Sequence, residues 1–147
     1  METIRCDIVS AHEQIYSGEA NRVIVPGAAG ELGIYPRHAP LMTLLKPGPL
    51  RVVQSDGEEF VFFAGGGILE VMPHLVTVLA DTAVRADHLD QAAAVRARDE
   101  AERKLKDQAV GMEFAEAELQ LKRALAELRA IEQFQLRTKY KKPEGSG

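Results

Sequence analysis

The sequence predicts an α+β protein in which an N-terminal antiparallel β-sandwich or flattened barrel of about ten short strands precedes a C-terminal antiparallel two-helix hairpin. Two observations support this fold class. Up to about Arg85, apolar and polar residues alternate with a period of two in short runs. From Asp87 onward, the apolar period changes to about 3.6, which is typical of α-helices.

The predicted strands are short and are separated by glycine and proline. Alternating apolar residues form four clear runs: Ile4, Cys6 and Ile8; Val23 and Val25; Leu50 and Val52; and Phe60 and Phe62. Asp56-Gly57, between the last two runs, is the strongest hairpin signal. Further loops or hairpins are expected at residues 26–30, 46–49, 65–67 and 73–74.

The helical part begins at Asp87, a favourable N-cap residue, with Asp90 in the first turn. The first predicted helix ends near Lys106, and the second runs from about Glu113 to Tyr140. The two helices are joined by a short link, residues 107–112, and a short link predicts an antiparallel hairpin. The chain is therefore divided into a β-sandwich domain (1–86), a helical hairpin (87–140) and a disordered tail (141–147).

The apolar faces of the two predicted helices are rich in alanine. They comprise Leu89, Ala93, Ala97, Ala101 and Leu105 on the first helix, and Phe114, Ala117, Leu121, Ala124, Leu128 and Ile131 on the second. Such faces let the two helices approach each other closely but bury little apolar area. The hairpin must therefore be stabilised by packing against the sandwich or against a partner. Two interpretations stay open: a switch element with two docking surfaces, or a hairpin packed permanently on the sandwich.

Composition narrows the class of protein. Hydrophobic residues make up 46% and charged residues 27%, as in soluble globular proteins. No uncharged run is long enough to span a membrane, and the N-terminus does not resemble a signal or transit peptide, so a cytoplasmic protein is expected. Cys6 is expected to be a buried thiol. The four histidines show no ligand spacing, so neither a metal nor a cofactor is expected.

Charge is distributed unevenly along the chain. Residues 122–142 contain seven basic and two acidic residues, whereas the chain as a whole has a net charge of −4. A basic terminal segment indicates contact with nucleic acid, a membrane surface or an acidic protein face. Because aromatic residues are only 5% of the chain, nucleic-acid binding is poorly supported.

No catalytic motif is apparent. The glycines at 27, 30 and 33 lack the lysine and the helix of a phosphate-binding loop. Glu31 and His38 have no accompanying nucleophile, so no enzymatic activity is expected. Instead, Glu31, Arg37 and His38 are predicted to lie on one loop stiffened by Pro36 and Pro40, either as a binding loop or as a simple polar turn.

Four segments together resemble the ε subunits of the rotary F-type ATP synthases, in the family's order and spacing. These are Ser10 to Gly18, Gly30 to Leu41, Gly65 to Val71 and Val78 to Ala83. The resemblance covers residues 1 to about 136. It implies a non-catalytic central-stalk subunit that couples proton-driven rotation to ATP synthesis and inhibits ATP hydrolysis, at the cytoplasmic face of the bacterial inner membrane. The alternative is a free-standing module whose basic helix contacts nucleic acid or an acidic protein.

The resemblance also implies roles for particular residues. Glu31, Tyr35, Arg37 and His38 would contact the c-ring and the γ subunit. Lys122, Arg123 and Arg129 would approach an acidic segment of the catalytic α/β hexamer.

Some family members bind ATP through a Leu-Asp pair followed by Arg-Ala. Here Leu89-Asp90 is followed by Ala93 where arginine is expected, so weak or absent ATP binding is predicted. Loss of such a charge-assisted contact lowers affinity by about ten- to a hundredfold.

Overall fold

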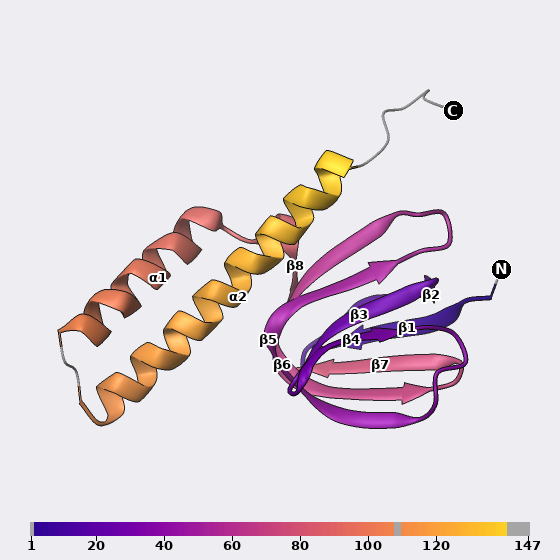
Figure 1. The fold of residues 1–147 in the computed structure, drawn as a ribbon, viewed down its shortest axis with the longest axis horizontal. Coiled ribbons are helices and arrows are strands. Elements are labelled where there is room, and N and C mark those ends of the chain that lie inside the picture. The colour runs from indigo at the N-terminus through magenta and orange to yellow at the C-terminus, as the bar shows by residue number, and fades with distance from the viewer. Residues whose placement is uncertain (1, 108–109, 141–147) are drawn as a thin grey trace.

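The computed structural model describes residues 2–107 and 110–140, with side chains to Arg137. Figure 1 shows a two-layered β-sandwich with a helical hairpin against one side. The strands are β1 (Ile4–Val9), β2 (Gln14–Ala20), β3 (Arg22–Gly27), β4 (Gly30–Ile34), β5 (Leu41–Val53), β6 (Glu59–Met72), β7 (Leu75–Ala80) and β8 (Ala83–Arg85). A 3₁₀ turn, η1 (Ala86–His88), leads into the helices α1 (Gln91–Lys106) and α2 (Met112–Tyr140).

The two long strands β5 and β6 connect the layers. They pair with each other from Leu41↔Val71 to Val53↔Glu59. The sheet order is β2-β1-β7-β6-β5-β3-β4, and β8 pairs with β6. Every pair is antiparallel except β1 and β7, which run parallel. The predicted fold class is thus confirmed, with one parallel pair that was not predicted.

The prediction of about ten short strands was wrong, because two expected loops lie inside continuous strands. Pro47 and Gly48 lie within β5, and Gly66 and Gly67 within β6. Gly66 and Gly67 have φ angles of 106° and 141°, a region open to glycine. A Cβ on Gly67 would also overlap the Leu79 carbonyl oxygen. These residues bend the strands without ending them, so the described residues form eight strands.

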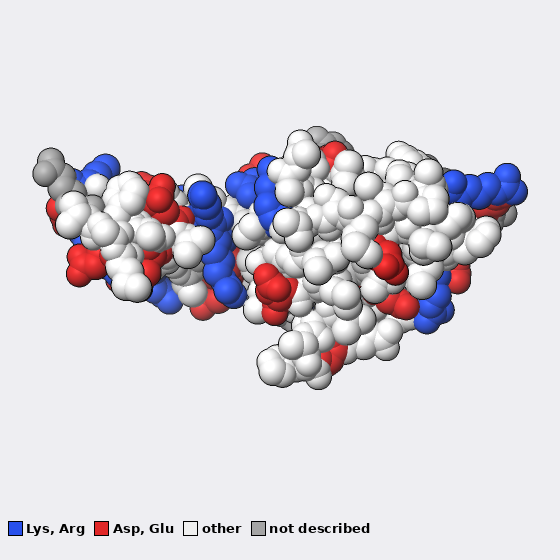
Figure 2. Space-filling view, turned by 90° about the horizontal axis from the view of Figure 1, so that it is seen from below, with Lys and Arg blue, Asp and Glu red and all other residues white. Residues whose placement is uncertain are grey.

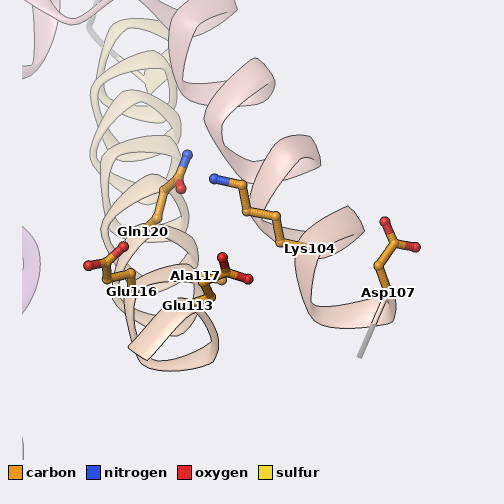
Figure 3. Close-up of a pocket in the computed structure, with 6 residues that line it drawn as sticks. All are labelled: Lys104, Asp107, Glu113, Glu116, Ala117 and Gln120. Atoms are coloured by element: carbon orange, nitrogen blue, oxygen red, sulfur yellow. The ribbon is translucent and has the colours of Figure 1, made fainter. Parts of the chain in front are cut away.

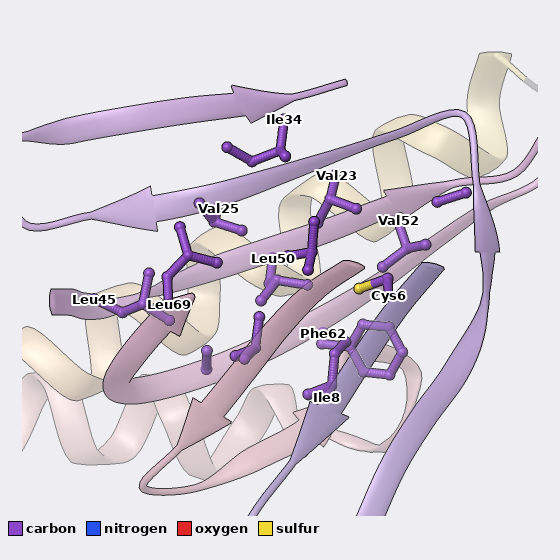
Figure 4. Close-up of a cluster of buried hydrophobic side chains, with 14 of the residues drawn as sticks. Cys6, Ile8, Val23, Val25, Ile34, Leu45, Leu50, Val52, Phe62 and Leu69 are labelled. Carbon is purple, nitrogen blue, oxygen red and sulfur yellow. The ribbon is translucent and has the colours of Figure 1, made fainter. Parts of the chain in front are cut away.

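Large aliphatic and aromatic side chains fill the space between the layers (Figure 4). Phe62, Ile4, Ile8 and Leu50 are among the largest fully buried side chains. Cys6 is buried with them, as predicted. Burial first, and the nearby Asp7 carboxylate second, raise the pKa of the Cys6 thiol from 9.0 to about 12. The predicted Asp56-Gly57 hairpin is confirmed: Gly57 has a φ of 88°, and the Glu58 N–H donates to Asp56 Oδ1 at 2.8 Å.

The first helix begins later than predicted. Asp90, not Asp87, is its N-cap, and its Oδ1 accepts a hydrogen bond from the Ala93 N–H at 3.1 Å. Asp87 lies instead in η1, and Arg85 donates to its carboxylate at 3.2 Å. The predicted end of α1 at Lys106 and the predicted range of α2 agree with the structure to within one residue. The predicted tail, 141–147, lies outside the described residues.

Alanines form the seam between α1 and α2. Ala94 and Ala101 of α1, with Ala117 and Ala124 of α2, are buried. The predicted stripe was only partly right, since Ala93 is exposed. Residues four apart on an α-helix are offset by about 40°, so a stripe that advances by four each time winds off the buried face. No helix within 2–107 or 110–140 combines the length and apolar character needed to cross a membrane.

Candidate functional surfaces

The predicted binding loop is divided in the structure. Glu31 lies in β4, exposed and paired with Pro26 of β3, and not in a loop as expected. Tyr35, Arg37 and His38 follow the strand and are separated from Glu31 by the rest of β4. Along an extended strand, Glu31 and Tyr35 are about 13 Å apart. The four residues therefore do not form one compact site.

The segment from Tyr35 to His38 is fixed by local contacts. Arg37 has a φ of 66°, a backbone conformation rare for residues other than glycine. Its N–H donates to the Pro73 carbonyl oxygen at 2.9 Å, and its guanidinium pairs with the Glu2 carboxylate. The His38 N–H donates to the Tyr35 carbonyl oxygen at 3.1 Å. The Tyr35 ring is exposed beside this turn, which lies against the β6–β7 connection.

The sequence analysis did not identify the exposed residues of an apolar surface on the sandwich. Alternate residues of β5, β6 and β7 point away from the core. Large apolar side chains among them are between 40% and 66% exposed. We define the outer face as the surface formed by Met42, Leu44, Ile68, Glu70, Met72 and Leu79. The sequence contained a signal for this surface, because 41–45 and 68–72 carry large apolar residues on both alternations, and only one alternation can face the core.

The register places these side chains side by side. Leu44 is paired with Ile68, and Ile68 is paired in turn with Leu79. Met42 is opposite Glu70. Figure 2 shows wide uncharged areas on the sandwich, whereas charges of both signs crowd the hairpin. Contiguous apolar surface of this kind usually marks a protein-binding site.

The hairpin contacts the sandwich through a second, smaller cluster. We call it the docking cluster: Val61, Phe63, Ala86, Ala126 and Ala130 are buried in it, and Leu89 and Phe134 pack at its edge. Only Phe63 and Phe134 are aromatic, and three of the five buried members are alanine. The hairpin is therefore held by much less apolar surface than the sandwich core contains.

Two arginines of α2 strengthen this contact. The Arg123 guanidinium lies 5.6 Å from the centre of the Phe63 ring. The Arg137 guanidinium lies 4.6 Å from the centre of the Phe134 ring, and its Nη1 donates to the Glu59 carbonyl oxygen at 3.1 Å. Phe134 also lies on α2, so Arg137 holds the sandwich through its hydrogen bond, whereas Arg123 does so through the Phe63 ring. A cation–π contact contributes about 0.5–1 kcal/mol at an exposed site. Part of the predicted basic surface thus serves to hold the hairpin against the sandwich.

The other predicted basic residues point elsewhere. Lys122 and Arg129 are exposed, and neither forms an ion pair among the described residues. Arg123, in addition to its ring contact, pairs with Glu127 at 3.8 Å. The three residues therefore do not act as one cluster in this position of the hairpin: Arg123 faces the sandwich, whereas Lys122 and Arg129 face solvent.

A groove of about 440 Å³ lies between the helices near their connection (Figure 3). It is lined by Lys104, Asp107, Glu113, Glu116, Ala117 and Gln120. Among the described residues that line it, Lys104 alone is cationic, and this lysine pairs with Glu100 at 3.3 Å. The carboxylates make the groove unfavourable for phosphate groups. Asp90, the predicted nucleotide contact, caps the opposite end of α1.

Comparison with known proteins identifies the family. The β-sandwich domain model described as "ATP synthase, Delta/Epsilon chain" matches residues 3–86, and the long α-helix domain model of the same description matches residues 87–132. The chain belongs to the ATP synthase delta/epsilon chain family. The resemblance seen in the sequence is thereby confirmed.

Curated relatives in the family are similar over nearly their whole length. The chain is 52% identical to the ATP synthase epsilon chain of Halorhodospira halophila, over 95% of this chain and 99% of that one. It is 51% identical to the epsilon chain of Stenotrophomonas maltophilia, over 95% and 100%. A chain in the Euglena gracilis mitochondrial ATP synthase shares the fold, with a TM-score of 0.78, 20% identity, and coverage of 91% of this chain and 81% of that one.

Proposed function

We propose that this chain is a rotor subunit of an F-type ATP synthase with two separable tasks. The sandwich couples rotation of the c-ring to the catalytic α/β hexamer by holding the γ subunit, the shaft of the rotor. The helical hairpin inhibits ATP hydrolysis. The chain itself catalyses no reaction, and it is held at the cytoplasmic face of the bacterial inner membrane through the complex.

The observation that carries this proposal is the contrast between the exposed outer face and the lightly held hairpin. The outer face offers the γ subunit an apolar surface on a rigid sheet. Glu31, and at the far end of β4 the group of Tyr35, Arg37 and His38, are contacts for the c-ring. The fixed turn at Arg37 suits this role, because preorganised side chains lose little entropy on binding.

The proposed inhibition of ATP hydrolysis follows from the small docking cluster. A hairpin held mainly by alanines and two arginine contacts can leave the sandwich at modest free-energy cost. Lys122 and Arg129 are exposed in the docked position, and undocking would add Arg123 to them. An acidic surface on the hexamer then competes with the Phe63 ring and the Glu59 carbonyl oxygen of the sandwich for the positively charged helix.

The experiment compares ATP hydrolysis and ATP synthesis in the reconstituted complex. The full chain carrying Lys122→Ala and Arg129→Ala is expected to raise hydrolysis severalfold and leave synthesis unchanged. Arg103→Ala, an exposed basic residue on α1, is the matched control and should change neither rate. An unchanged rate of hydrolysis in the double variant would show that this face of α2 does not inhibit hydrolysis.

ATP binding by the isolated chain should be weak or absent. Ala93 gives only its backbone N–H to the Asp90 cap, and it supplies no cation for a phosphate. Isothermal titration with Mg-ATP is expected to show no saturable heat at micromolar concentrations. Micromolar affinity would contradict this expectation.

A further inference from the structure

Glu70 is the acidic residue of the otherwise apolar outer face. It is exposed in β6, with Ile68 and Met72 on either side along the strand. Across the sheet it is opposite Met42 of β5 and Thr77 of β7. Within the described part of the chain, its carboxylate has neither an ion pair nor a hydrogen bond from another side chain.

Asp7 shows that the sheet can satisfy a carboxylate when the sequence provides partners. Asp7 lies in the same cross-strand row, opposite Thr77. Its Oδ1 accepts a hydrogen bond from Ser17 at 2.7 Å and pairs with Arg5 Nε at 3.3 Å. Glu70 has no equivalent partners among residues 2–107 and 110–137. Lys46 lies in β5 between Leu45 and Pro47, which are paired with Gly67 and Gly65, so about four residues of strand, about 13 Å, separate its position from Glu70.

A partner that covers the outer face removes water from Glu70. Burial of an ionised carboxylate without a charge partner is strongly unfavourable, and it would offset the gain from covering the neighbouring methionine and leucine side chains. The occupant must therefore bring a cation to this position. A second copy of this chain fits poorly, because a two-fold pairing of outer faces would bring two Glu70 carboxylates together.

We propose that the segment of the γ subunit seated on the outer face presents an arginine or lysine side chain to Glu70, and that this ion pair sets the register of the sandwich on the shaft. The inference rests on the proposed function, since it takes the γ subunit as the occupant. Apolar contacts with Met42, Leu44, Ile68 and Leu79 supply affinity that tolerates sliding. The buried ion pair allows one register only, because a displaced segment would leave both charges unpaired.

The test measures the affinity of the full chain for the purified γ subunit by isothermal titration at low and moderate salt. Glu70→Gln should weaken binding by about 30-fold or more, the range for truncating one member of a buried charge pair. Glu70→Lys should weaken it further. Leu44→Ser tests the apolar part of the same face and should weaken binding about tenfold. Glu58→Gln, exposed at the distant β5–β6 turn, is the matched control and should bind like the wild type.

The variants distinguish the ion pair at Glu70 from the apolar contact with the γ subunit. If Leu44→Ser weakens binding and Glu70→Gln does not, the ion pair is overturned while the apolar contact with the γ subunit stands. If neither variant changes affinity, the outer face is not the γ surface, and both ideas fail. Tighter binding of Glu70→Gln would also overturn the ion pair. Sedimentation of the wild-type chain should show a monomer. If the wild type is instead a dimer and Leu44→Ser is a monomer, the outer face binds a second copy of this chain and not the γ subunit, and the proposal is overturned.

Discussion

The sandwich and the hairpin bury different kinds of side chain. Phenylalanine, isoleucine, leucine and valine fill the space between the two layers of the sandwich. The buried positions of the hairpin are almost all alanine, from Ala94 in α1 to Ala130 in α2, with Ile131 as the large exception. Buried apolar area is the main source of folding free energy, so the two regions should differ strongly in stability. The proposed function depends on this difference, because it requires a rigid sandwich and a hairpin that can detach from it.

Truncation of the sandwich core should have the largest effect. Phe62→Ala is expected to lower the free energy of unfolding by about 3–5 kcal/mol, because it leaves a cavity in a closely packed core. Tyr16, whose ring centre is 5.7 Å from that of Phe62, reports the transition by fluorescence during urea unfolding. Phe114→Ala, at an exposed position of α2, is the control and should change little. Equal losses of unfolding free energy in both variants would contradict the expected difference in stability between the sandwich and the hairpin.

Alkaline pH should destabilise the sandwich through Cys6. Burial raises the pKa of its thiol from 9.0 to about 12 in the folded state, so the fold favours the neutral form. This contribution is fully present below pH 9.0 and is lost as pH rises toward about 12. At about 1.4 kcal/mol per pH unit, the loss is at most about 4 kcal/mol.

Urea unfolding at several pH values from 8 to 11 measures this loss, and Cys6→Ala should flatten the decline. Burial also raises the pKa of Tyr16, so Tyr16→Phe is the control for its titration in an overlapping range. The same decline in the wild type and in Cys6→Ala would rule out the thiol as its source.

Enlarging the alanine seam should affect the hairpin alone. Ala124→Leu forces α1 and α2 apart and is expected to destabilise the hairpin by about 1–3 kcal/mol. Helical circular dichroism should fall at lower temperature, while the Tyr16 signal of the sandwich keeps its midpoint. Leu125→Ala, at the neighbouring exposed position, is the matched control. A joint shift of both signals would mean that the two regions unfold together.

Removing the Arg137 contact should have the smallest effect of the four. Arg137→Met keeps an apolar stem near Phe134 but removes the hydrogen bond to the Glu59 carbonyl oxygen. The docked state should lose about 1 kcal/mol, seen as faster limited proteolysis within α2. Arg129→Met, on the exposed side of the same helix, should be cleaved at the wild-type rate.

The elements that depend on local chemistry could be predicted from the sequence. The alternation of Ile4, Cys6 and Ile8 predicted a buried strand, and Asp56-Gly57 predicted a hairpin, because turn type and side-chain period are local properties. The same local rules failed at Pro47 and at Gly66-Gly67. There the long antiparallel ladder of β5 and β6 continues through residues that usually end strands, so tertiary pairing overrode the local signal.

The candidate surfaces depend on contacts that no short stretch of sequence contains. Arg123 meets Phe63 only because α2 packs across β6, so its docking role could not be read from the basic segment. Glu31 and His38 are close in sequence, yet β4 extends between them. The outer face becomes visible only when the register aligns Leu44, Ile68 and Leu79 on three strands.

Hydrogen exchange of the full, isolated chain tests the central claim most directly, namely that a weakly docked hairpin is attached to a strongly held sandwich. Amides of β1, β5, β6 and β7 should exchange only through global unfolding. Amides of α1 and α2 should exchange through a separate opening several kcal/mol lower in free energy. If both sets exchange with the same free energy and the same denaturant dependence, the chain unfolds as one unit, and the claim is contradicted.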